Sequence, residues 1–194
     1  MKCDIILAGV GGQGILSIAT VLGYAAIESG LSLKQAEVHG MSQRGGAVQS
    51  HLRIAQGFIH SDLVALGGAD LVVSVEPMEA LRYLPWLGPE GWVVTNTTPF
   101  VNIPDYPREA ELAASLEALP RKVAIDADGI ARDAGNPRGM NMAVAGAASL
   151  FIDIPFINME AGVKAIFSRK GEEVVEKNLA VLREGRRQAE AARG

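Results

Sequence analysis

The first stretch of the chain whose residue types could do chemistry is a glycine-rich turn, Gly9-Val10-Gly11-Gly12-Gln13-Gly14. An apolar run, Cys3 to Ala8, precedes the turn, and a long apolar segment, Ile15 to Ile27, follows it. Glycine adopts positive φ readily, and a turn between a strand and a helix leaves free N–H groups at the positive end of the helix dipole. The turn therefore predicts a nucleotide or pyrophosphate site. Its candidate residues are Gly9, Gly11, Gly12, Gln13 and Gly14.

Two other interpretations of this turn were weighed. Gly9 and Gly14 also have the spacing of a P-loop, but a P-loop continues with Lys and then Ser or Thr. Ile15 and Leu16 occupy those positions, so ATP hydrolysis with bound magnesium is disfavoured. The second interpretation is a tight turn that only packs the helix on the strand, and the sequence alone leaves it open.

A second glycine-rich segment, His39 to Gly46, is polar, contains one arginine and lacks helical periodicity. A guanidinium offers paired donors in a fixed plane, which suits a phosphate or a carboxylate. The segment predicts a binding loop, and its alternative is a hairpin turn with an exposed arginine. Its candidate residues are Ser42, Gln43, Arg44, Gly45 and Gly46.

Polar residues near the ends of predicted strands give three further candidates. Glu37 follows the first turn by about 20 residues, where a dinucleotide fold places the acid that binds a ribose hydroxyl. The alternative is a solvated glutamate on an edge strand. Asn96 and Thr98 come directly after the apolar run Trp92 to Thr95, and open parallel sheets bind ligands at the carboxyl ends of their strands. The same Asn-Thr-Thr-Pro sequence is also an ordinary turn.

The sequence disfavours metal and serine-hydrolase chemistry. The spacings of His39, His51 and His60 match no helical or zinc-knuckle pattern, and no G-x-S-x-G pentapeptide occurs. Cys3 is the only cysteine, so the chain has no internal disulfide and no thiolate set for an iron–sulfur cluster or a structural zinc.

The charge and hydropathy of the chain limit the kinds of partner that it can bind. The 18 basic and 22 acidic residues give a formal charge of -4 without any basic run, which excludes nucleic acid as the main partner. Apolar stretches are interrupted well before the roughly 18 residues of a membrane span, and the first residues lead into a strand instead of a signal peptide. We expect a soluble, cytoplasmic protein with no membrane partner, and the length suits one domain over residues 1–194.

The elements that must position these candidates alternate between strands and helices. This alternation predicts an α/β fold, a Rossmann-like three-layer α/β/α arrangement with a mostly parallel sheet. Ala47 to Ala55 alternates apolar and polar side chains after only a short turn, so it is expected to run antiparallel. The other predicted strands are Cys3–Ala8, Leu33–Val38, Leu71–Val75, Trp92–Thr95 and Val123–Asp126. The predicted helices are Ile15–Ile27, Met78–Leu87, Glu109–Leu119, Asn141–Phe151 and Glu172–Arg193.

Taken together, Gly9 to Gly14 and the loop Met41-Ser42-Gln43-Arg44-Gly45-Gly46 resemble the gamma subunit, or gamma domain, of 2-oxoacid:ferredoxin oxidoreductases. The resemblance covers essentially the whole chain and implies the fold of domain III of pyruvate:ferredoxin oxidoreductase. Pyruvate and 2-oxoglutarate members usually carry a Gly-Pro-Glu-x-Arg-Gly-Gly loop. The Ser-Gln-Arg-Gly-Gly form looks like the branch that acts on aryl pyruvates such as indolepyruvate.

This resemblance implies an enzyme that oxidatively decarboxylates an aryl pyruvate with thiamine diphosphate, passes electrons through iron–sulfur clusters to ferredoxin, and captures the acyl group on coenzyme A. The chain lacks the cysteines for a cluster, and Ala127-Asp128-Gly129 is not followed by the Asn-Asn pair of a thiamine motif. The resemblance therefore places both centres on a companion alpha subunit. It leaves this chain as a non-catalytic subunit that completes the assembly and helps to bind coenzyme A through the glycine turn and Arg44.

Two alternatives stay open. One is an independent NAD-dependent dehydrogenase of Rossmann type, although none of the histidines has a recognisable acid–base context. The other is a structural or regulatory subunit that binds no ligand. If the chain is instead the gamma-type subunit that the resemblance implies, Gly9–Gly14 and Met41–Gly46 should lie side by side at the carboxyl edge of the sheet, in a crevice that faces the partner.

Overall fold

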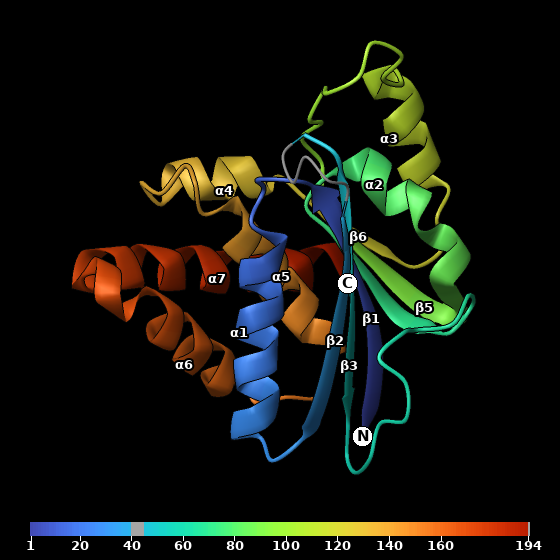
Figure 1. The fold of residues 1–194 in the computed structure, drawn as a ribbon. Helices are drawn as coiled ribbons and strands as arrows, with labels where there is room; N and C mark the ends of the chain where they lie inside the picture. Colours follow the sequence, from blue (N-terminus) through green and yellow to red (C-terminus); the bar gives the residue numbers. More distant parts are fainter. Residues whose placement is uncertain (40–44, 194) are drawn as a thin grey trace.

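The chain forms one six-stranded sheet with the strand order β2-β3-β1-β4-β5-β6 (Figure 1). The computed structural model describes residues 1–39 and 45–193. β4, β5 and β6 follow β1 in parallel register, whereas β3 runs antiparallel to both β1 and β2. The predicted mostly parallel sheet and the antiparallel strand are both confirmed. The strands are β1 Lys2–Val10, β2 Ser32–His39, β3 Ala47–Ala55, β4 Ala69–Ser74, β5 Leu87–Asn96 and β6 Lys122–Ile125.

Helices cover both faces of the sheet, which gives the three layers that the sequence predicts (Figure 1). One face carries α1 Ile15–Glu28, α4 Ala127–Asp133, α5 Met140–Ala148, α6 Phe156–Phe167 and α7 Glu172–Arg193. The other face carries only α2 Pro77–Arg82 and α3 Glu109–Glu117. No helix in the described residues is long and apolar enough to cross a membrane.

The central strand β1 is buried on both sides because each face of the sheet has its own core. Successive side chains on a strand point to opposite faces. Cys3, Ile5 and Leu7 therefore enter the larger core under the five helices, while Ile6 and Ala8 enter the smaller core beside α2. Burial on both faces explains why Ile5 to Ala8 form a continuous apolar run within this strand.

α5 and α7 pack backbone against backbone. A Cβ at Gly146 would collide with the carbonyl of Leu182, and a Cβ at Gly185 would collide with the carbonyl of Ala143. Only glycine permits so close an approach. The small residues of α5 thus serve close packing, as their composition predicts.

Three helical segments differ from the sequence-based expectation. The predicted helix Met78–Leu87 ends at Arg82, because Pro85 lacks an N–H and disfavours helical geometry in the residue before it. A 3-10 turn, Leu84–Trp86, follows and leads directly into β5. α4 and α6 were not predicted. For α4 the sequence did contain a capping residue, Asp126, whose side chain accepts a hydrogen bond from the Gly129 N–H at 2.8 Å.

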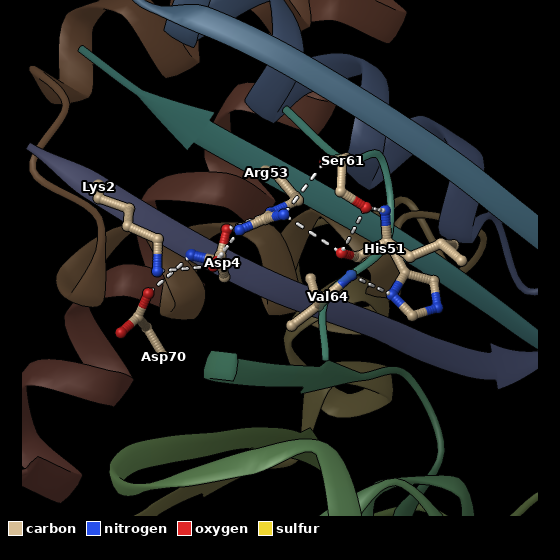
Figure 2. Close-up of polar contacts among 8 residues, drawn as sticks. Lys2, Asp4, His51, Arg53, Ser61, Val64 and Asp70 are labelled. Atoms are coloured by element: carbon tan, nitrogen blue, oxygen red, sulfur yellow. Dashed lines mark hydrogen bonds and ion pairs between the residues drawn. The ribbon is translucent and has the colours of Figure 1, made fainter. Parts of the chain in front are cut away.

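At the amino end of the parallel strands, a polar cluster fastens the β3–β4 loop, residues 56–68, to the sheet (Figure 2). We call Lys2, Asp4, His51, Arg53 and Asp70 the closed cluster. The Asp4 carboxylate is buried and accepts from Arg53 Nε at 2.7 Å and from Arg53 Nη2 at 2.9 Å. The backbone N–H of Asp4 donates to Asp70 Oδ2 at 2.7 Å.

The closed cluster reaches the loop through two side chains of β3. Arg53 Nη1 donates to the carbonyls of Ser61 and Leu63 at 3.1 and 3.2 Å. His51 Nδ1 accepts from the Val64 N–H at 3.1 Å. The loop is therefore held at three positions, Ser61, Leu63 and Val64, by two side chains of β3.

Candidate functional site

The predicted strand, glycine turn and helix follow one another as expected, but β1 continues through Gly9 and Val10, two residues beyond the predicted strand, so only Gly11 to Gly14 connect it to α1. Gly12 and Gly14 have φ values of 105° and 82°, a conformation that side chains rarely adopt. A Cβ at Gly12 would have no atom of the described residues within 4 Å. Gly9 differs, because a Cβ there would collide with the side chain of Val75. Packing thus accounts for Gly9, whereas Gly12 faces open space.

The two glycine-rich loops lie side by side. The Gly11 N–H donates to the Gly46 carbonyl at 2.9 Å, and the Gly45 N–H donates to the Gly11 carbonyl at 3.2 Å. The predicted juxtaposition is confirmed for these residues. Ser42, Gln43 and Arg44, the other candidates in this loop, lie outside the described residues. The loop joins β2 to β3, which are antiparallel neighbours, so it is also the connection of a hairpin.

Four N–H groups at the start of α1 have no acceptor within the described part of the chain. They belong to Gly12, Gly14, Ile15 and Leu16. By contrast, the Gln13 N–H donates to the Val10 carbonyl at 3.1 Å. Unpaired donors at the amino end of a helix, together with its positive dipole end, form an anion-binding arrangement. The local geometry therefore suits a phosphate or pyrophosphate.

These donors open into a cavity of about 420 Å³ between the glycine turn and the hairpin. This volume lies within the usual range of ligand pockets, about 300–1,000 Å³. The turn lines one side of the cavity, and the ends of β2 and β3 line the other. We call this space the glycine crevice. It is lined by Gly11, Gly12, Gly14, Ile15, Leu16, Glu37, His39 and Val48.

Two amides hold the turn in this shape. Gln13 Oε1 accepts from the Val10 N–H at 2.8 Å, so the Gln13 side chain closes the turn on itself. Asn141, on α5, donates from Nδ2 to the Gly14 carbonyl at 3.0 Å and is 7% exposed. Sequence reasoning missed Asn141 because it lies 127 positions from its partner. A polar residue at the start of an apolar helix was the only available signal.

Glu37 lines the glycine crevice from the edge strand β2. Its carboxylate is exposed and accepts from Gln35 Nε2 at 2.7 Å. In a dinucleotide fold the strand with this acid lies next to the first strand. Here β3 separates the two strands, which places β2 about 10 Å from β1 at the usual strand spacing of about 4.8 Å. Ribose binding by Glu37 stays a prediction.

Asn96 lies at the carboxyl end of β5, but its side chain is 1% exposed and serves the fold. Nδ2 donates to the carbonyl of Val75 at 3.3 Å and to Asp128 Oδ2 at 2.8 Å, and Oδ1 accepts from the Ala127 N–H at 3.1 Å. Thr98 is exposed, and neither residue lines the glycine crevice. A ligand contact by Asn96 or Thr98 stays a prediction.

Residues 1–39 and 45–193 offer no set of ligands that would fit a metal centre or a cluster. No group of three His, Cys, Asp or Glu side chains in the described residues could hold a metal ion. Cys3 is 4% exposed, and burial, followed by the nearby Asp70 and Asp4 charges, raises the pKa of its thiol to about 12. A cluster needs thiolates, and burial disfavours the thiolate form of Cys3.

Comparison with known proteins gives one family and a consistent set of relatives. The family model described as pyruvate ferredoxin/flavodoxin oxidoreductase matches residues 4–188. The indolepyruvate oxidoreductase subunit IorB of Archaeoglobus fulgidus is 35% identical over 200 residues, which cover 100% of this chain and 98% of that protein.

Two solved structures share the fold. The gamma subunit of a keto/oxoacid ferredoxin oxidoreductase from Geobacter sulfurreducens has a TM-score of 0.71 at 23% identity and matches 98% of this chain and 99% of its own. The 2-oxoglutarate:ferredoxin oxidoreductase of Magnetococcus marinus, solved with 2-oxoglutarate, coenzyme A and succinyl-CoA bound, has a TM-score of 0.76 at 20% identity. The match covers 98% of this chain but only 31% of that longer chain. At these identities the two likenesses concern the fold alone.

Proposed function

The chain belongs to the pyruvate ferredoxin/flavodoxin oxidoreductase family, as a subunit of such an oxidoreductase, and we propose that it is the non-catalytic subunit of an enzyme that oxidises aryl pyruvates. Indolepyruvate is the first candidate substrate. The identity to an indolepyruvate oxidoreductase subunit supports this choice, and so does the Ser42-Gln43-Arg44-Gly45-Gly46 form of the second loop. In this proposal the chain has two tasks: it completes a coenzyme A site, and it stabilises the assembly.

The observation that carries the coenzyme A task is the set of N–H groups in the glycine turn and at the start of α1 that have no acceptor in the described residues. Coenzyme A contains a pyrophosphate, and the four donors of the turn open into a cavity of about 420 Å³. Backbone N–H groups at a helix terminus bind such an anion without a basic side chain. Arg44 would add a charged, planar donor from the neighbouring loop.

The redox chemistry belongs to a companion alpha subunit in this proposal. Thiamine diphosphate there would supply the decarboxylation, and iron–sulfur clusters would carry electrons to ferredoxin. The residues of this chain would bind and orient the pyrophosphate, so that the thiol end of coenzyme A reaches the companion subunit. The buried Cys3 takes no part in electron transfer.

Exposed apolar side chains beside the glycine crevice support the assembly task. Leu16 lines the crevice and is 52% exposed, and Phe100 and Val101 are 44% and 72% exposed. Asn102, the next residue, donates from Nδ2 to the Gly45 carbonyl at 2.8 Å, which ties the Phe100–Val101 segment to the loop beside the crevice. We call Leu16, Phe100 and Val101 the apolar rim. Grouped apolar exposure next to a binding site marks an interaction surface. Its proposed occupant is the companion subunit that would close the crevice.

Reconstitution with the companion subunit tests the proposal. The expected result is no oxidoreductase activity from either subunit alone. The mixture should reduce ferredoxin or a dye, dependent on both indolepyruvate and coenzyme A. Pyruvate and 2-oxoglutarate should be poorer substrates. Reduction of NAD by this chain alone would contradict the proposal and favour the independent dehydrogenase.

Two matched variants test the apolar rim. Val101→Asp places a charge on the rim and should weaken association of the two subunits by at least about tenfold, because a charge would be buried in the interface. Leu66→Asp introduces the same charge at a residue of similar exposure, 68%, in the β3–β4 loop. Analytical ultracentrifugation should show wild-type association for Leu66→Asp. Equal behaviour of the two variants would remove the rim from the interface.

A further inference from the structure

The loop between β5 and α3, residues 97–108, is tied to the sheet by one buried carboxylate. Glu76 is 0% exposed and precedes α2. Its Oε1 accepts from the Phe100 N–H at 3.3 Å and from the Tyr106 hydroxyl. Its Oε2 accepts from the Glu79 N–H at 2.8 Å. A single side chain therefore contacts the loop at two positions six residues apart and the helix at a third.

Capping α2 alone would need only one of these oxygens. A carboxylate without water requires donors, and the amino end of a helix supplies one through Glu79. The loop supplies the other donors. Burial, and then the hydrogen bond to Glu76, raise the pKa of the Tyr106 hydroxyl, so this phenol stays a donor throughout the physiological range. The loop conformation is thus coupled to the sheet through Glu76.

From this loop the hydrogen bonds continue to the glycine crevice. Asn102, between the two contacts to Glu76, donates from Nδ2 to the Gly45 carbonyl at 2.8 Å. The Gly45 N–H donates to the Gly11 carbonyl at 3.2 Å, and the Gly11 N–H donates to the Gly46 carbonyl at 2.9 Å. Gly11 lines the crevice. An unbroken path therefore runs from a buried carboxylate through a loop to the wall of the site.

We propose that Glu76, Tyr106 and Asn102 are positioning residues that hold the β2–β3 hairpin against the glycine turn and thereby set the width of the coenzyme A crevice. This inference rests on the proposed coenzyme A role. None of the three side chains lines the crevice itself. Their effect reaches the ligand through Gly45, Gly46 and Gly11. Sequence reasoning missed them because Tyr106 lies 30 positions from Glu76 and Asn102 lies 57 from Gly45.

The first test is a double-mutant cycle in the reconstituted complex. Tyr106→Phe removes the hydroxyl that reaches Glu76, and Asn102→Ala removes the bond to Gly45. Each variant should raise the KM for coenzyme A by about three- to tenfold, the range expected for one hydrogen bond. kcat and the KM for the 2-oxo acid should stay unchanged at saturating coenzyme A. The double variant should do little more than the stronger single variant, because both residues act along one path.

Two matched controls lie outside the path. Tyr83→Phe removes the hydroxyl of a second tyrosine, buried directly after α2, for which the described residues show no hydrogen bond to residues 97–108. Asn158→Ala removes an amide whose Nδ2 donates to Ser29 Oγ at 2.9 Å, far from the crevice. Both should leave the KM for coenzyme A unchanged. A general loss of stability would affect controls and test variants alike.

The second test needs no coenzyme A. Amide hydrogen exchange at Gly11 and Gly45 reports the hydrogen bonds between the loops, and Tyr106→Phe should speed exchange at both positions. Unchanged exchange would overturn the positioning role, and so would fully additive KM effects. A wild-type complex without coenzyme A dependence, but with faster exchange in Tyr106→Phe, would contradict the proposed function and leave the positioning role standing.

Discussion

The two ends of the sheet treat polar groups in opposite ways. At the amino end, the buried Asp4 carboxylate and the partly buried Arg53 guanidinium bond to each other, and Arg53 also bonds to the β3–β4 loop (Figure 2). At the carboxyl end, Gly12, Gly14 and their neighbours present N–H groups without an acceptor in the described residues. Polar groups that are satisfied within the chain specify its structure. Polar groups left unsatisfied beside a cavity are available to a ligand.

This contrast separates stability from binding. Substitutions in the closed cluster should lower the free energy of unfolding and leave coenzyme A use intact in what refolds. Substitutions in the glycine crevice should weaken coenzyme A use beyond any effect on folding. Paired substitutions in the two regions can test this separation.

Asp4→Ala should cost about 3 kcal/mol of stability. Removing one partner of a buried ion pair typically costs about 3–5 kcal/mol, and the Arg53 side chain is 19% exposed, so water can relieve part of the loss. Asp62→Ala is the matched control, because it breaks an exposed pair in which Lys34 Nζ lies 2.8 Å from Asp62 Oδ1. It should cost less than about 1 kcal/mol. Urea unfolding of both variants measures the difference, and equal losses would contradict the role of burial.

Gly12→Val should weaken coenzyme A use by about a hundredfold or more. A β-branched side chain at a φ of 105° strains the turn, and it projects toward the crevice that Gly12 lines. Gly57→Val is the matched control, with a φ of 95° and no atom within 4 Å of its Cβ, in the β3–β4 loop.

The two valine variants should lose similar amounts of stability, because they strain the backbone in the same way. Only Gly12→Val should raise the KM for coenzyme A in the reconstituted complex. A similar rise in both variants would show that strain, and not the crevice, controls binding.

Arg44→Ala should weaken coenzyme A use by roughly ten- to a hundredfold. One charge-assisted contact contributes about 1.5–3 kcal/mol, and about 1.4 kcal/mol corresponds to a factor of ten. Arg169→Ala removes an exposed arginine after α6 and should have no such effect. Steady-state kinetics of the complex, with assembly verified, is the measurement. Unchanged affinity in Arg44→Ala would favour the hairpin-turn interpretation of its loop.

His51 should make stability fall as pH decreases below about 6.5. Burial, and then the Arg53 charge, lower the pKa of His51 in the folded chain, so the unfolded chain binds the proton first. The contribution is fully present above the unfolded pKa and is lost as pH falls, by up to about 1.4 kcal/mol per pH unit. In His51→Gln this slope between pH 7 and 5 should flatten, whereas exposed His60→Gln should keep it. Urea unfolding over this range checks the sign.

Asp4, the acidic partner of Arg53, affects stability over a lower pH range than His51 does. Burial opposes ionisation of Asp4, but hydrogen bonds from Arg53 and Lys2 outweigh it and hold the pKa of Asp4 below its usual value. Its stabilisation is therefore present above about pH 4 and lost only as pH falls further. A stability loss between pH 7 and 5 that survives in His51→Gln would point to another group.

Local sequence signals predicted those elements whose formation depends on residues close together in the sequence. The strand–turn–helix of Gly9 to Gly14, the antiparallel strand from Ala47 and the terminal helix Glu172–Arg193 all follow from periodicity and turn chemistry. The limits also have local causes. Pro85 ends the helical segment that begins at Pro77 earlier than its periodicity predicts. Asp126 caps α4, a helix that the polar composition of residues 127–139 did not indicate.

The candidate site was predicted only in part, because its supports come from distant positions. The juxtaposition of Gly11 with Gly45 and Gly46 follows from two glycine loops after early strands. The contact of Asn141 with Gly14 depends on how α5 packs, and the contact of Tyr106 with Glu76 depends on the course of a long loop. Neither leaves a periodic or spacing signal in the sequence.

Amide hydrogen exchange of the assembled complex, with and without coenzyme A, tests the central claim most directly. Coenzyme A should slow exchange at the N–H groups that have no acceptor in the described residues, because they would gain the pyrophosphate as acceptor. These are the N–H groups of Gly12, Gly14, Ile15 and Leu16. The amide of Val64, already bonded to His51 in the closed cluster, should exchange at the same rate in both states. Exchange at the turn that coenzyme A leaves unchanged, in a complex that uses coenzyme A, would contradict the account.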